Sequence, residues 1–546
     1  MAHARLGQPR IHPSHLRGIF HFCRSDSDMA TKRYYVTTAI PYVNGPPHVG
    51  HALEFVQTDA LARYHRRTGE DTYFLTGSDD NSLKNVRAAE DEGIPVGDLV
   101  SRNTDSFVEL DRVLDISYDQ FIRTSVDERH RQGAQRLWRA VQESGDLYEQ
   151  VYAGLYCLSC EQFYEPDELV DGLCPEHFIA PERVEETNYF FRLSRYQDQL
   201  EQLISSGQYR IIPDQRRNEV LSFIRSGLRD FSVSRSQERA RGWGIPVPGD
   251  ETQVMYVWFD ALSNYITALG YATDGELYRR YWVENDCRVH VIGKGITRFH
   301  AVYWPAMLLS AGVPLPHVLF VHGYYTVEGR RIGKSMGNAI DPVALARRYG
   351  SEALRYFCLG ATPSTGDTDF SMDSFESRYN ADLANDLGNL LNRTVSMIGR
   401  YRDGVVPEAP HPDRDHAMLV EQARALPELI AGCMEEYDFP AALAQIWRVV
   451  GEANRYVERQ APWRLARPAV GTDEIDTAAK LDSVLNTLTQ VLRLVALELE
   501  PFLPRTSAAI LAQLGCDSDS SDNVAGLRVS TPQPLFPRLE VGVAEQ

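Results

Sequence analysis

Two histidines stand where side chains could bind phosphate. Pro46–His51 (Pro-Pro-His-Val-Gly-His) follows the apolar, β-branched run Tyr34–Ile40 and precedes an apolar segment. This order predicts a strand, a turn and a helix whose first turn carries His48 and His51. Backbone amides and the helix dipole favour anions there, imidazoles add donors, and Gly50 leaves room for a flat ligand. A nucleotide triphosphate would fit, although such a pair is more often a cap, a core contact or half a metal site.

A second candidate phosphate contact lies far along the chain. Residues 331–338 (Arg-Ile-Gly-Lys-Ser-Met-Gly-Asn) form a loop of small residues with one lysine, Lys334, followed by Ser335. This loop resembles the lysine-serine loop that partners the HIGH-type histidine motif in class I aminoacyl-tRNA synthetases. Both segments, in this order, favour one shared nucleotide site.

Cysteine and histidine side chains form two chelating pairs near the middle of the chain. Cys157 with Cys160, and Cys174 with His177, each have two residues between the ligands. That spacing is typical of a closed zinc knuckle. Because four protein ligands leave no open position for water, we expect Zn²⁺ to stabilise a small insertion rather than to catalyse. The remaining cysteines are scattered, which argues against a disulfide framework and suits a reducing cytoplasm.

An acidic turn follows a second apolar strand, at residues 78–81. The carboxyl ends of parallel strands meet at one edge of a sheet, so this turn should face the same crevice as the two histidines. Asp79 there could hold the ammonium group of an amino acid, and it could equally be part of a capped turn.

An aromatic stripe marks a predicted helix over residues 299–307. His300 and Trp304 are four apart and hence on one face, with Phe299 and Tyr303 in the adjoining row. Such a stripe is usually core. An aromatic cavity with one histidine also suits a thioether, because sulfur–ring contacts contribute about 0.3–1.5 kcal/mol each.

The elements that position these residues alternate between strand and helix up to residue 345, which predicts an α/β fold with a Rossmann-type parallel sheet. Residues 255–260 are predicted to resume that sheet as a strand. Beyond 345 the periodicity is helical, with breaks at prolines, which predicts a bundle. The predicted divisions are 1–32, a disordered tail or misassigned start; 33–145 and 230–345, two halves of a catalytic domain; 146–229, the insertion with the zinc knuckle; 346–382, a linking region; 383–515, the bundle; and 516–546, a flexible tail.

Composition excludes some classes of protein. The chain has 546 residues, 43% of them hydrophobic, and a net charge of −19. No apolar run is long enough to span a membrane. The negative charge argues against non-specific coating of nucleic acid, but a tRNA partner needs only a local basic face. Seven arginines between 216 and 241 could supply that face, or could be a solvated surface balanced by acids.

Together these segments resemble methionyl-tRNA synthetase, from about Arg33 to about Pro504. The resemblance also includes the segments 39–45 (Ala-Ile-Pro-Tyr-Val-Asn-Gly), 256–261 (Tyr-Val-Trp-Phe-Asp-Ala), 298–306, 381–389 and 461–463 (Ala-Pro-Trp). A single knuckle with three cysteines and a histidine also occurs in this family. Leucyl, isoleucyl and valyl relatives normally carry a large editing domain, for which this chain has no room.

The resemblance implies ATP-dependent ligation of methionine to tRNA(Met), with a helical anticodon-binding domain. It implies Mg²⁺ with the ATP, one structural Zn²⁺ and a cytoplasmic location. The absence of an appended nucleic-acid-binding barrel indicates a monomer, and no membrane partner is expected. The implied site residues are His48, Gly50, His51, Glu54, Lys334 and Ser335 for ATP, of which His48, His51 and Lys334 are catalytic; Ile40, Tyr42, Asp79, Trp258, Tyr265, His300 and Trp304 for methionine; Cys157, Cys160, Cys174 and His177 for zinc; and Asn389, Arg393 and Trp463 for the anticodon.

Several positions depart from the family pattern around the expected crevice. Asn81 and Ser82 replace a histidine and a glycine, and Gly295 replaces an acid. Arg331 replaces a lysine, which exchanges a point charge for a planar fork, and paired tryptophans are replaced by tyrosines at 324 and 325. A weakly active or non-catalytic tRNA-binding paralogue is therefore the alternative function. An enzyme for another amino acid ranks last, since the aromatic residues of the methionine set are retained.

Overall fold

The computed structural model describes residues 32–157, 162–164, 166–175, 178–285, 287–332, 338–410, 413–467, 473–519 and 523–539. Four of the predicted site residues, Cys160, His177, Lys334 and Ser335, lie outside these ranges. The segments that flank them are described.

A six-stranded parallel sheet forms the centre of the first part of the chain, in the order β3-β2-β1-β12-β13-β7. Its strands are β1 (Arg33–Thr38), β2 (Asp71–Ser78), β3 (Gln120–Arg123), β7 (Arg210–Ile212), β12 (Arg288–Gly293) and β13 (Val318–His322). The central strands β1 and β12 are almost wholly buried, as expected where helices cover both faces of a parallel sheet. The predicted Rossmann-type sheet is confirmed.

Alternate residues of β1 point into two different cores. Tyr34 and Val36 belong to the core shared with α1 (Val49–Arg67) and α3 (Val96–Leu114). Tyr35 belongs to the opposite core, which includes α4 (Glu128–Glu143), α7 (Val257–Thr267) and α9 (Trp304–Ser310). This alternation follows from the two-residue period of a strand. Each face of the sheet is therefore held by its own set of helices.

A separate antiparallel sheet forms the insertion, in the order β5-β4-β6-β8. Its strands are β4 (Leu147–Cys157), β5 (Gln162–Tyr164), β6 (Glu182–Phe191) and β8 (Phe231–Ser232). The prediction that residues 255–260 resume the main sheet is wrong. β11 (Asp250–Met255) pairs with β9 (Ser234–Ser236) and β10 (Pro246–Val247) in a small third sheet, and α7 begins at Val257. Every residue of α7 is buried, so its short apolar run has no helical polar face to distinguish it from a strand.

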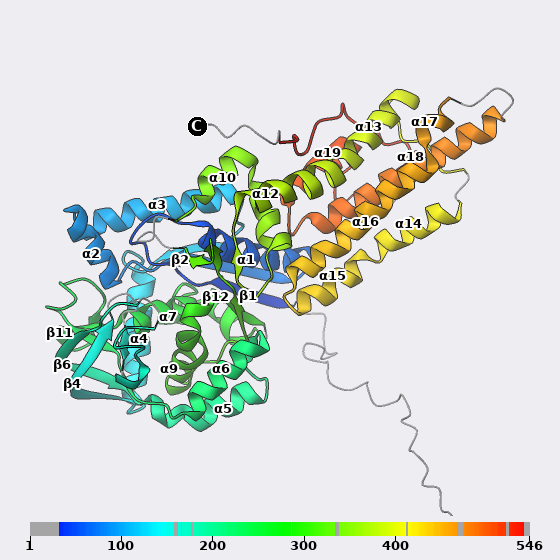
Figure 1. Cartoon of the computed structure of the whole chain (residues 1–546). Helices are drawn as coiled ribbons and strands as arrows, with labels where there is room; N and C mark the ends of the chain where they lie inside the picture. The colour runs from blue at the N-terminus through cyan, green and yellow to red at the C-terminus, as the bar shows by residue number, and fades with distance from the viewer. Residues whose placement is uncertain are drawn as a thin grey trace, which may run out of the picture.

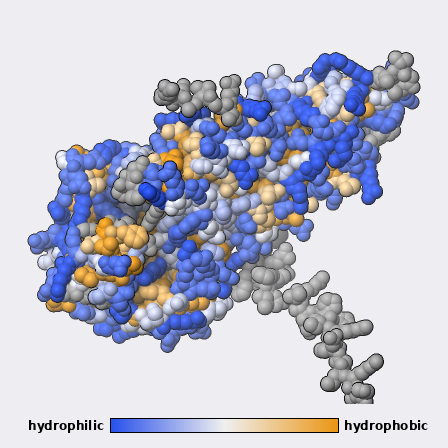
Figure 2. Space-filling model, viewed as in Figure 1, coloured by the Kyte–Doolittle hydropathy of each residue, from blue (hydrophilic) through white to orange (hydrophobic). Residues whose placement is uncertain are grey.

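The helices of the C-terminal part extend away from the sheet and make the molecule elongated (Figure 1). They are α13 (Asn389–Tyr401), α14 (Arg414–Arg424), α15 (Leu426–Glu435), α16 (Phe439–Gln460), α17 (Pro462–Leu465), α18 (Glu474–Leu499) and α19 (Pro504–Leu514). The predicted bundle is confirmed. On the face shown in Figure 2 its surface is mostly hydrophilic. Among the described helices, none is long and apolar enough to cross a membrane.

The predicted flexible tail is wrong for residues 523–539. Val524 is fully buried, and Val406 donates its amide to the carbonyl of Leu527. The hydroxyl of Tyr379 donates to the carbonyl of Pro537 at 2.9 Å. This segment lacks helical or strand periodicity, and it packs on the bundle through a few apolar residues and backbone hydrogen bonds, which composition does not reveal.

Candidate active site

The N-terminus of α1 is built from the two predicted histidines. His48 caps the helix, because its Nδ1 accepts a hydrogen bond from the amide of Gly50 at 3.1 Å. The amide of His48 donates to Nδ1 of His51 at 3.1 Å, and the two rings stack with centroids 4.0 Å apart. A Cβ at residue 50 would lie 2.9 Å from the ring of His48, so glycine is needed there. The structure thus gives these histidines a capping role.

The same hydrogen bonds fix the tautomer of each ring. Since Nδ1 accepts in both His48 and His51, the proton of each neutral ring is on Nε2, which is then a donor. Amides at the start of α1 and the helix dipole add positive potential at the same end. Capping and phosphate binding are therefore compatible, because they use different nitrogens.

Glu54 ties α1 to the ends of two strands. Its Oε1 accepts from the amide of Ala39 at 2.8 Å, and its Oε2 lies 2.8 Å from Nε2 of His322. Ala39 follows β1 and His322 ends β13, so one carboxylate joins the helix to two carboxyl ends of the sheet. Glu54 thereby helps to position the histidine turn.

The segment that carries Lys334 is described only at its two ends. It leaves the hairpin of β14 (Tyr325–Val327) and β15 (Arg330–Arg331), and its far end is described again from Asn338. The amide of Val49, the first residue of α1, donates to the carbonyl of Ile340 at 3.1 Å. The described flank of the lysine loop therefore contacts the histidine turn directly.

The acidic turn after β2 lies beside the segment after β1. Tyr42 and Asp79 form an isolated parallel bridge, and the amide of Asp79 donates to the carbonyl of Pro41 at 2.9 Å. Asp79 is 2% exposed. Ile40 precedes this bridge on the same segment, so the residues predicted to hold an ammonium group come from two adjacent strand ends.

The predicted methionine-binding aromatic residues lie close together. Trp258 stacks on Phe299 with ring centroids 3.8 Å apart, and Tyr42 meets Trp258 edge-on at 6.2 Å. Trp258 also meets His300 edge-on at 6.2 Å. Tyr265 lies 6.0 Å from Trp304. The structure brings all five predicted rings together, and it adds Phe299, which the sequence placed in the aromatic stripe but not among the methionine-binding residues.

His300 is neutral and fixed in one tautomer. Its Nδ1 lies 3.0 Å from the carbonyl of Ile296 and must donate to it, so Nε2 accepts from the hydroxyl of Tyr265 at 2.7 Å. Burial lowers the pKa of His300 to about 4. Residues 299–303 form a turn of π-helix before α9, where a plain α-helix was predicted. Such turns are frequent at functional sites.

Two departures from the family pattern have partners in the structure. The Asn81 amide group donates to Oδ2 of Asp260 at 2.7 Å, and Oδ1 of Asp260 lies 2.5 Å from Nε2 of the buried His130. The amide of Gly295 donates to the hydroxyl of Tyr324 at 2.6 Å. Each of these substituted residues therefore bonds a partner that is distant in the sequence. Comparing the chain with the family pattern one position at a time does not reveal such a partner.

The described half of the predicted zinc knuckle is compact. Cys157 and Cys174 are both fully buried and share a small cluster with Tyr164. Cys160 and His177 lie outside the described residues, and no group of three or more metal-ligating side chains occurs among the residues that are described. Two buried thiols in one small cluster suit a soft metal such as zinc.

The predicted anticodon residues lie near one end of the bundle. The guanidinium of Arg393 is 5.4 Å from the ring centroid of Trp463 and pairs with Glu458 at 2.8 Å. Asn389 stands one helical turn before Arg393 on α13 and is exposed. Trp463 is 38% exposed, so part of its ring is accessible to a base.

The arginine cluster between residues 216 and 241 is largely balanced by acids. Ion pairs join Arg216 to Glu219, Arg217 to Asp214, Arg225 to Glu201, Arg239 to Glu186 and Arg241 to Glu90. Arg235 is buried over the ring of Tyr256. Of the two interpretations left open by the sequence, the structure favours a balanced surface over a basic tRNA-binding face.

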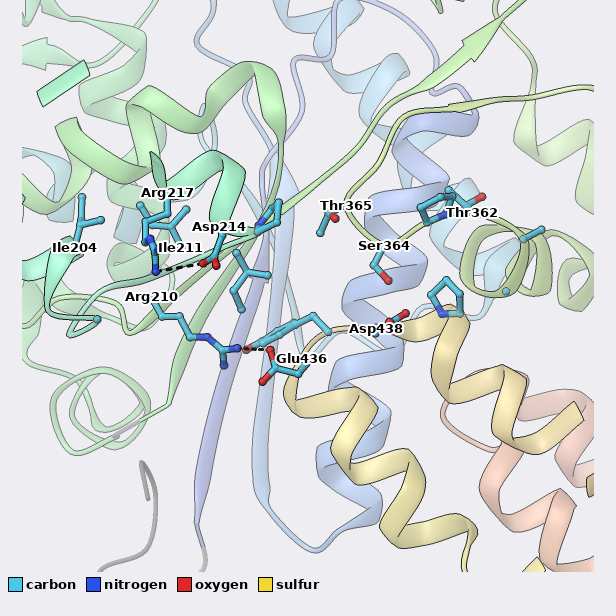
Figure 3. Close-up of a pocket in the computed structure, with 18 residues that line it drawn as sticks. Ile204, Arg210, Ile211, Asp214, Arg217, Thr362, Ser364, Thr365, Glu436 and Asp438 are labelled. Atoms are coloured by element: carbon cyan, nitrogen blue, oxygen red, sulfur yellow. Dashed lines mark hydrogen bonds and ion pairs between the residues drawn. The ribbon is translucent and has the colours of Figure 1, made fainter. Parts of the chain in front are cut away.

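A cavity of about 730 Å³ lies between the edge of the sheet and the bundle (Figure 3). It is bordered by β7, the start of α6 (Asp214–Arg225), residues 360–365 and the turn between α15 and α16. Arg210 pairs with Glu436 across it at 2.7 Å. None of the predicted site residues lines this cavity, so it is separate from the candidate active site.

A parallel sheet with a histidine-capped helix at its carboxyl edge, contacted by the residues that follow the lysine motif in the sequence, together with a helical bundle, has the architecture of a class I aminoacyl-tRNA synthetase. The family model described as "tRNA synthetases class I (M)" matches residues 34–180 and 178–395, and "Anticodon binding domain of methionyl tRNA ligase" matches residues 406–533. The chain belongs to the methionine–tRNA ligase family.

Individual relatives agree over nearly the whole length. Methionine–tRNA ligase of Brucella suis is 44% identical over 522 residues, which cover 93% of this chain and 98% of the relative. That of Mycobacterium bovis is 42% identical with the same coverage. The Mycobacterium tuberculosis methionyl-tRNA synthetase in complex with methionyl-adenylate superposes with a TM-score of 0.88 at 40% identity, covering 93% of this chain and all of that structure.

Proposed function

We propose that this chain activates methionine with ATP and then transfers the methionyl group to the 3′ end of tRNA(Met). Family membership supports the reaction, and the contact between Val49 and Ile340 supports the site most directly. That hydrogen bond joins the histidine turn to a residue six positions after Lys334, which supports one triphosphate held from two sides.

ATP is assigned to the N-terminus of α1. His48, Gly50 and His51 form the phosphate-facing turn, Glu54 holds it to the sheet, and Lys334 with Ser335 would approach from the loop. The methionine carboxylate attacks the α-phosphorus, and the bond to the pyrophosphate oxygen breaks as the new phosphorus–oxygen bond forms. The chain's own contribution is positioning and stabilisation of the negative charge on the triphosphate by His and Lys donors. Mg²⁺, bound with ATP, would add further charge neutralisation.

Methionine is assigned to the aromatic cluster. Ile40 and Asp79 would hold its ammonium group, while Tyr42, Trp258, Tyr265, His300 and Trp304 would enclose its thioether. A neutral, hydrogen-bonded His300 suits an uncharged sulfur better than an imidazolium would, because a buried charge without a counter-ion is costly. The acyl group then passes to a hydroxyl of the terminal adenosine, with AMP as leaving group.

Methionine-dependent exchange of labelled pyrophosphate into ATP tests the proposal on the purified, zinc-loaded chain. Exchange with methionine, followed by charging of tRNA(Met), is the expected result. Exchange that depends on another amino acid and not on methionine would contradict methionine as the substrate. Absence of both exchange and charging would contradict the enzyme and favour a non-catalytic tRNA-binding protein.

Zinc is assigned to Cys157, Cys160, Cys174 and His177 as a structural ion. Substitution of Cys157 by serine is expected to lower the zinc content from one ion per chain to below a tenth of that, since a closed site loses a thiolate ligand. Elemental analysis of the purified protein gives the zinc content directly. Cys358→Ser is the matched control, because Cys358 is buried in the core that α1 and α3 share. This variant should retain the full zinc content.

The anticodon is assigned to Asn389, Arg393 and Trp463. Trp463→Ala is expected to raise the KM for tRNA(Met) about tenfold, because stacking of a base on an aromatic ring contributes about 1–3 kcal/mol. Aminoacylation kinetics measure this, while the KM for methionine in pyrophosphate exchange should not change. An unchanged KM for tRNA would remove Trp463 from the anticodon site. The monomeric state and cytoplasmic location stay predictions of the sequence.

A further inference from the structure

A buried histidine lies directly behind the proposed methionine pocket. His290 on β12 is fully buried, and both of its ring nitrogens have partners. Nδ1 is 2.8 Å from Oγ1 of Thr37, which is opposite it in register on β1, and Nε2 is 3.3 Å from Nε1 of Trp304. The ring therefore connects the centre of the sheet to a wall of the pocket.

The indole determines which tautomer His290 adopts. Because an indole N–H can only donate, Nε2 of His290 accepts from Trp304, and the proton on Nδ1 is donated to Thr37. Burial, together with the neighbouring His300 and Arg288, lowers the pKa of His290 well below its usual value. A neutral ring is the form that this hydrogen-bond pattern requires.

His290 also contacts the rings that recognise the thioether in the proposed function. Its ring centroid is 4.1 Å from that of Tyr265 and 6.3 Å from that of His300. Tyr265 donates its hydroxyl to His300, and its own carbonyl accepts from the hydroxyl of Tyr35 at 2.7 Å. One buried ring thus touches three walls of the pocket, Tyr265, His300 and Trp304.

We infer that His290 is a positioning residue that fixes the back wall of the methionine pocket and so contributes to side-chain selectivity. The inference rests on the proposed function. An apolar residue would satisfy the buried strand equally well, but it would leave the Trp304 N–H and the Thr37 hydroxyl without this partner. Trp304 and Tyr265 would then settle in other orientations, and the depth of the pocket would change.

His290→Leu and His290→Gln test the inference. The leucine variant is expected to raise the KM for methionine roughly tenfold, the effect of one buried donor left unpaired, with the KM for ATP unchanged. Discrimination between methionine and norleucine, which lacks sulfur but has similar length, should weaken. Glutamine can accept from Trp304 and donate to Thr37, so it should restore most of the affinity. Pyrophosphate exchange gives both KM values, and calorimetry gives methionine binding independently of turnover.

The outcomes separate this inference from the proposed function. His416→Leu is the control, since this histidine bonds Thr487 within the bundle, and it should lower the melting temperature without changing either KM. A leucine variant at 290 with the wild-type affinity for methionine, or with equal rises for ATP and methionine, overturns the inference. Wild-type protein that binds methionine but shows no exchange overturns the function alone, and wild-type protein that binds no methionine overturns both.

Discussion

His51→Ala is expected to lower kcat of methionine-dependent pyrophosphate exchange by about 10²- to 10³-fold, the typical effect of removing one donor to a developing negative charge. The reason is that Nδ1 of His51 accepts from the amide of His48, which places the ring proton on Nε2, the nitrogen assigned to phosphate binding. Steady-state exchange kinetics measure the loss. The KM for methionine should stay nearly constant, because His51 is assigned to ATP and the aromatic cluster to methionine.

The control for this variant lies at the other end of the same helix. His65 stacks on Tyr34 with centroids 3.5 Å apart and bonds Glu70 at 2.9 Å. His65→Ala removes an imidazole from α1 without touching the phosphate-facing turn, so kcat should change little even if the melting temperature falls. Loss of exchange in both variants to the same extent would indicate a general effect on α1 and would contradict the assigned role of His51.

The part of the fold that sequence reasoning predicted is the part with clear periodicity. The parallel sheet and the bundle follow from buried β-branched runs and from long amphipathic helices such as α16 and α18. The predicted strand over residues 255–260 is wrong because α7 is buried on every side and so has no polar face that marks it as a helix. The segment 523–539 was missed because its packing depends on tertiary contacts rather than on a repeating pattern.

Residues of the candidate site were predictable where a motif carries them. The histidine turn and the aromatic stripe follow from the spacing of their residues. Within each of these two groups the structure brings the predicted residues together. His290 and His130 could not be found in this way, since each is a single polar residue at a buried position and belongs to no motif. Their roles depend on partners far away in the sequence, Trp304 and Thr37 for one and Asp260 for the other.

Arg355→Met is expected to lower the free energy of unfolding by about 3–5 kcal/mol, because it leaves a buried carboxylate without its main partner. Arg355 and Asp59 are both fully buried and lie 2.7 Å apart. The guanidinium also donates to the carbonyls of Phe502, Leu114 and Pro501, which joins α1 to the turn between α18 and α19. Denaturant unfolding measures the loss. Arg347→Met, which removes an exposed ion pair with Glu109, should cost less than about 1 kcal/mol.

The pH dependence of stability gives the same ion pair a second test. Burial raises the pKa of Asp59, but Arg355, then Arg63 and hydrogen bonds from Ser117, more than offset this, so that the pKa is below its usual 3.8. A carboxyl with a lowered folded-state pKa stabilises the protein above the unfolded pKa, and this stabilisation is lost as the pH falls through the folded value. Asp59→Asn should therefore reduce the acid sensitivity of unfolding below pH 4.

A double substitution separates the ion pair from simple loss of packing. If Arg355 acts chiefly by neutralising Asp59, the variant with both Arg355→Met and Asp59→Asn should lose at least about 1 kcal/mol less than the sum of the single losses. Additive losses would instead assign the role of Arg355 to its three backbone carbonyl partners. In either case Arg355 is fully buried at the junction of α1 with the bundle. The coupling energy between Arg355 and Asp59 therefore measures how firmly α1, which carries the histidine turn, is held to the bundle.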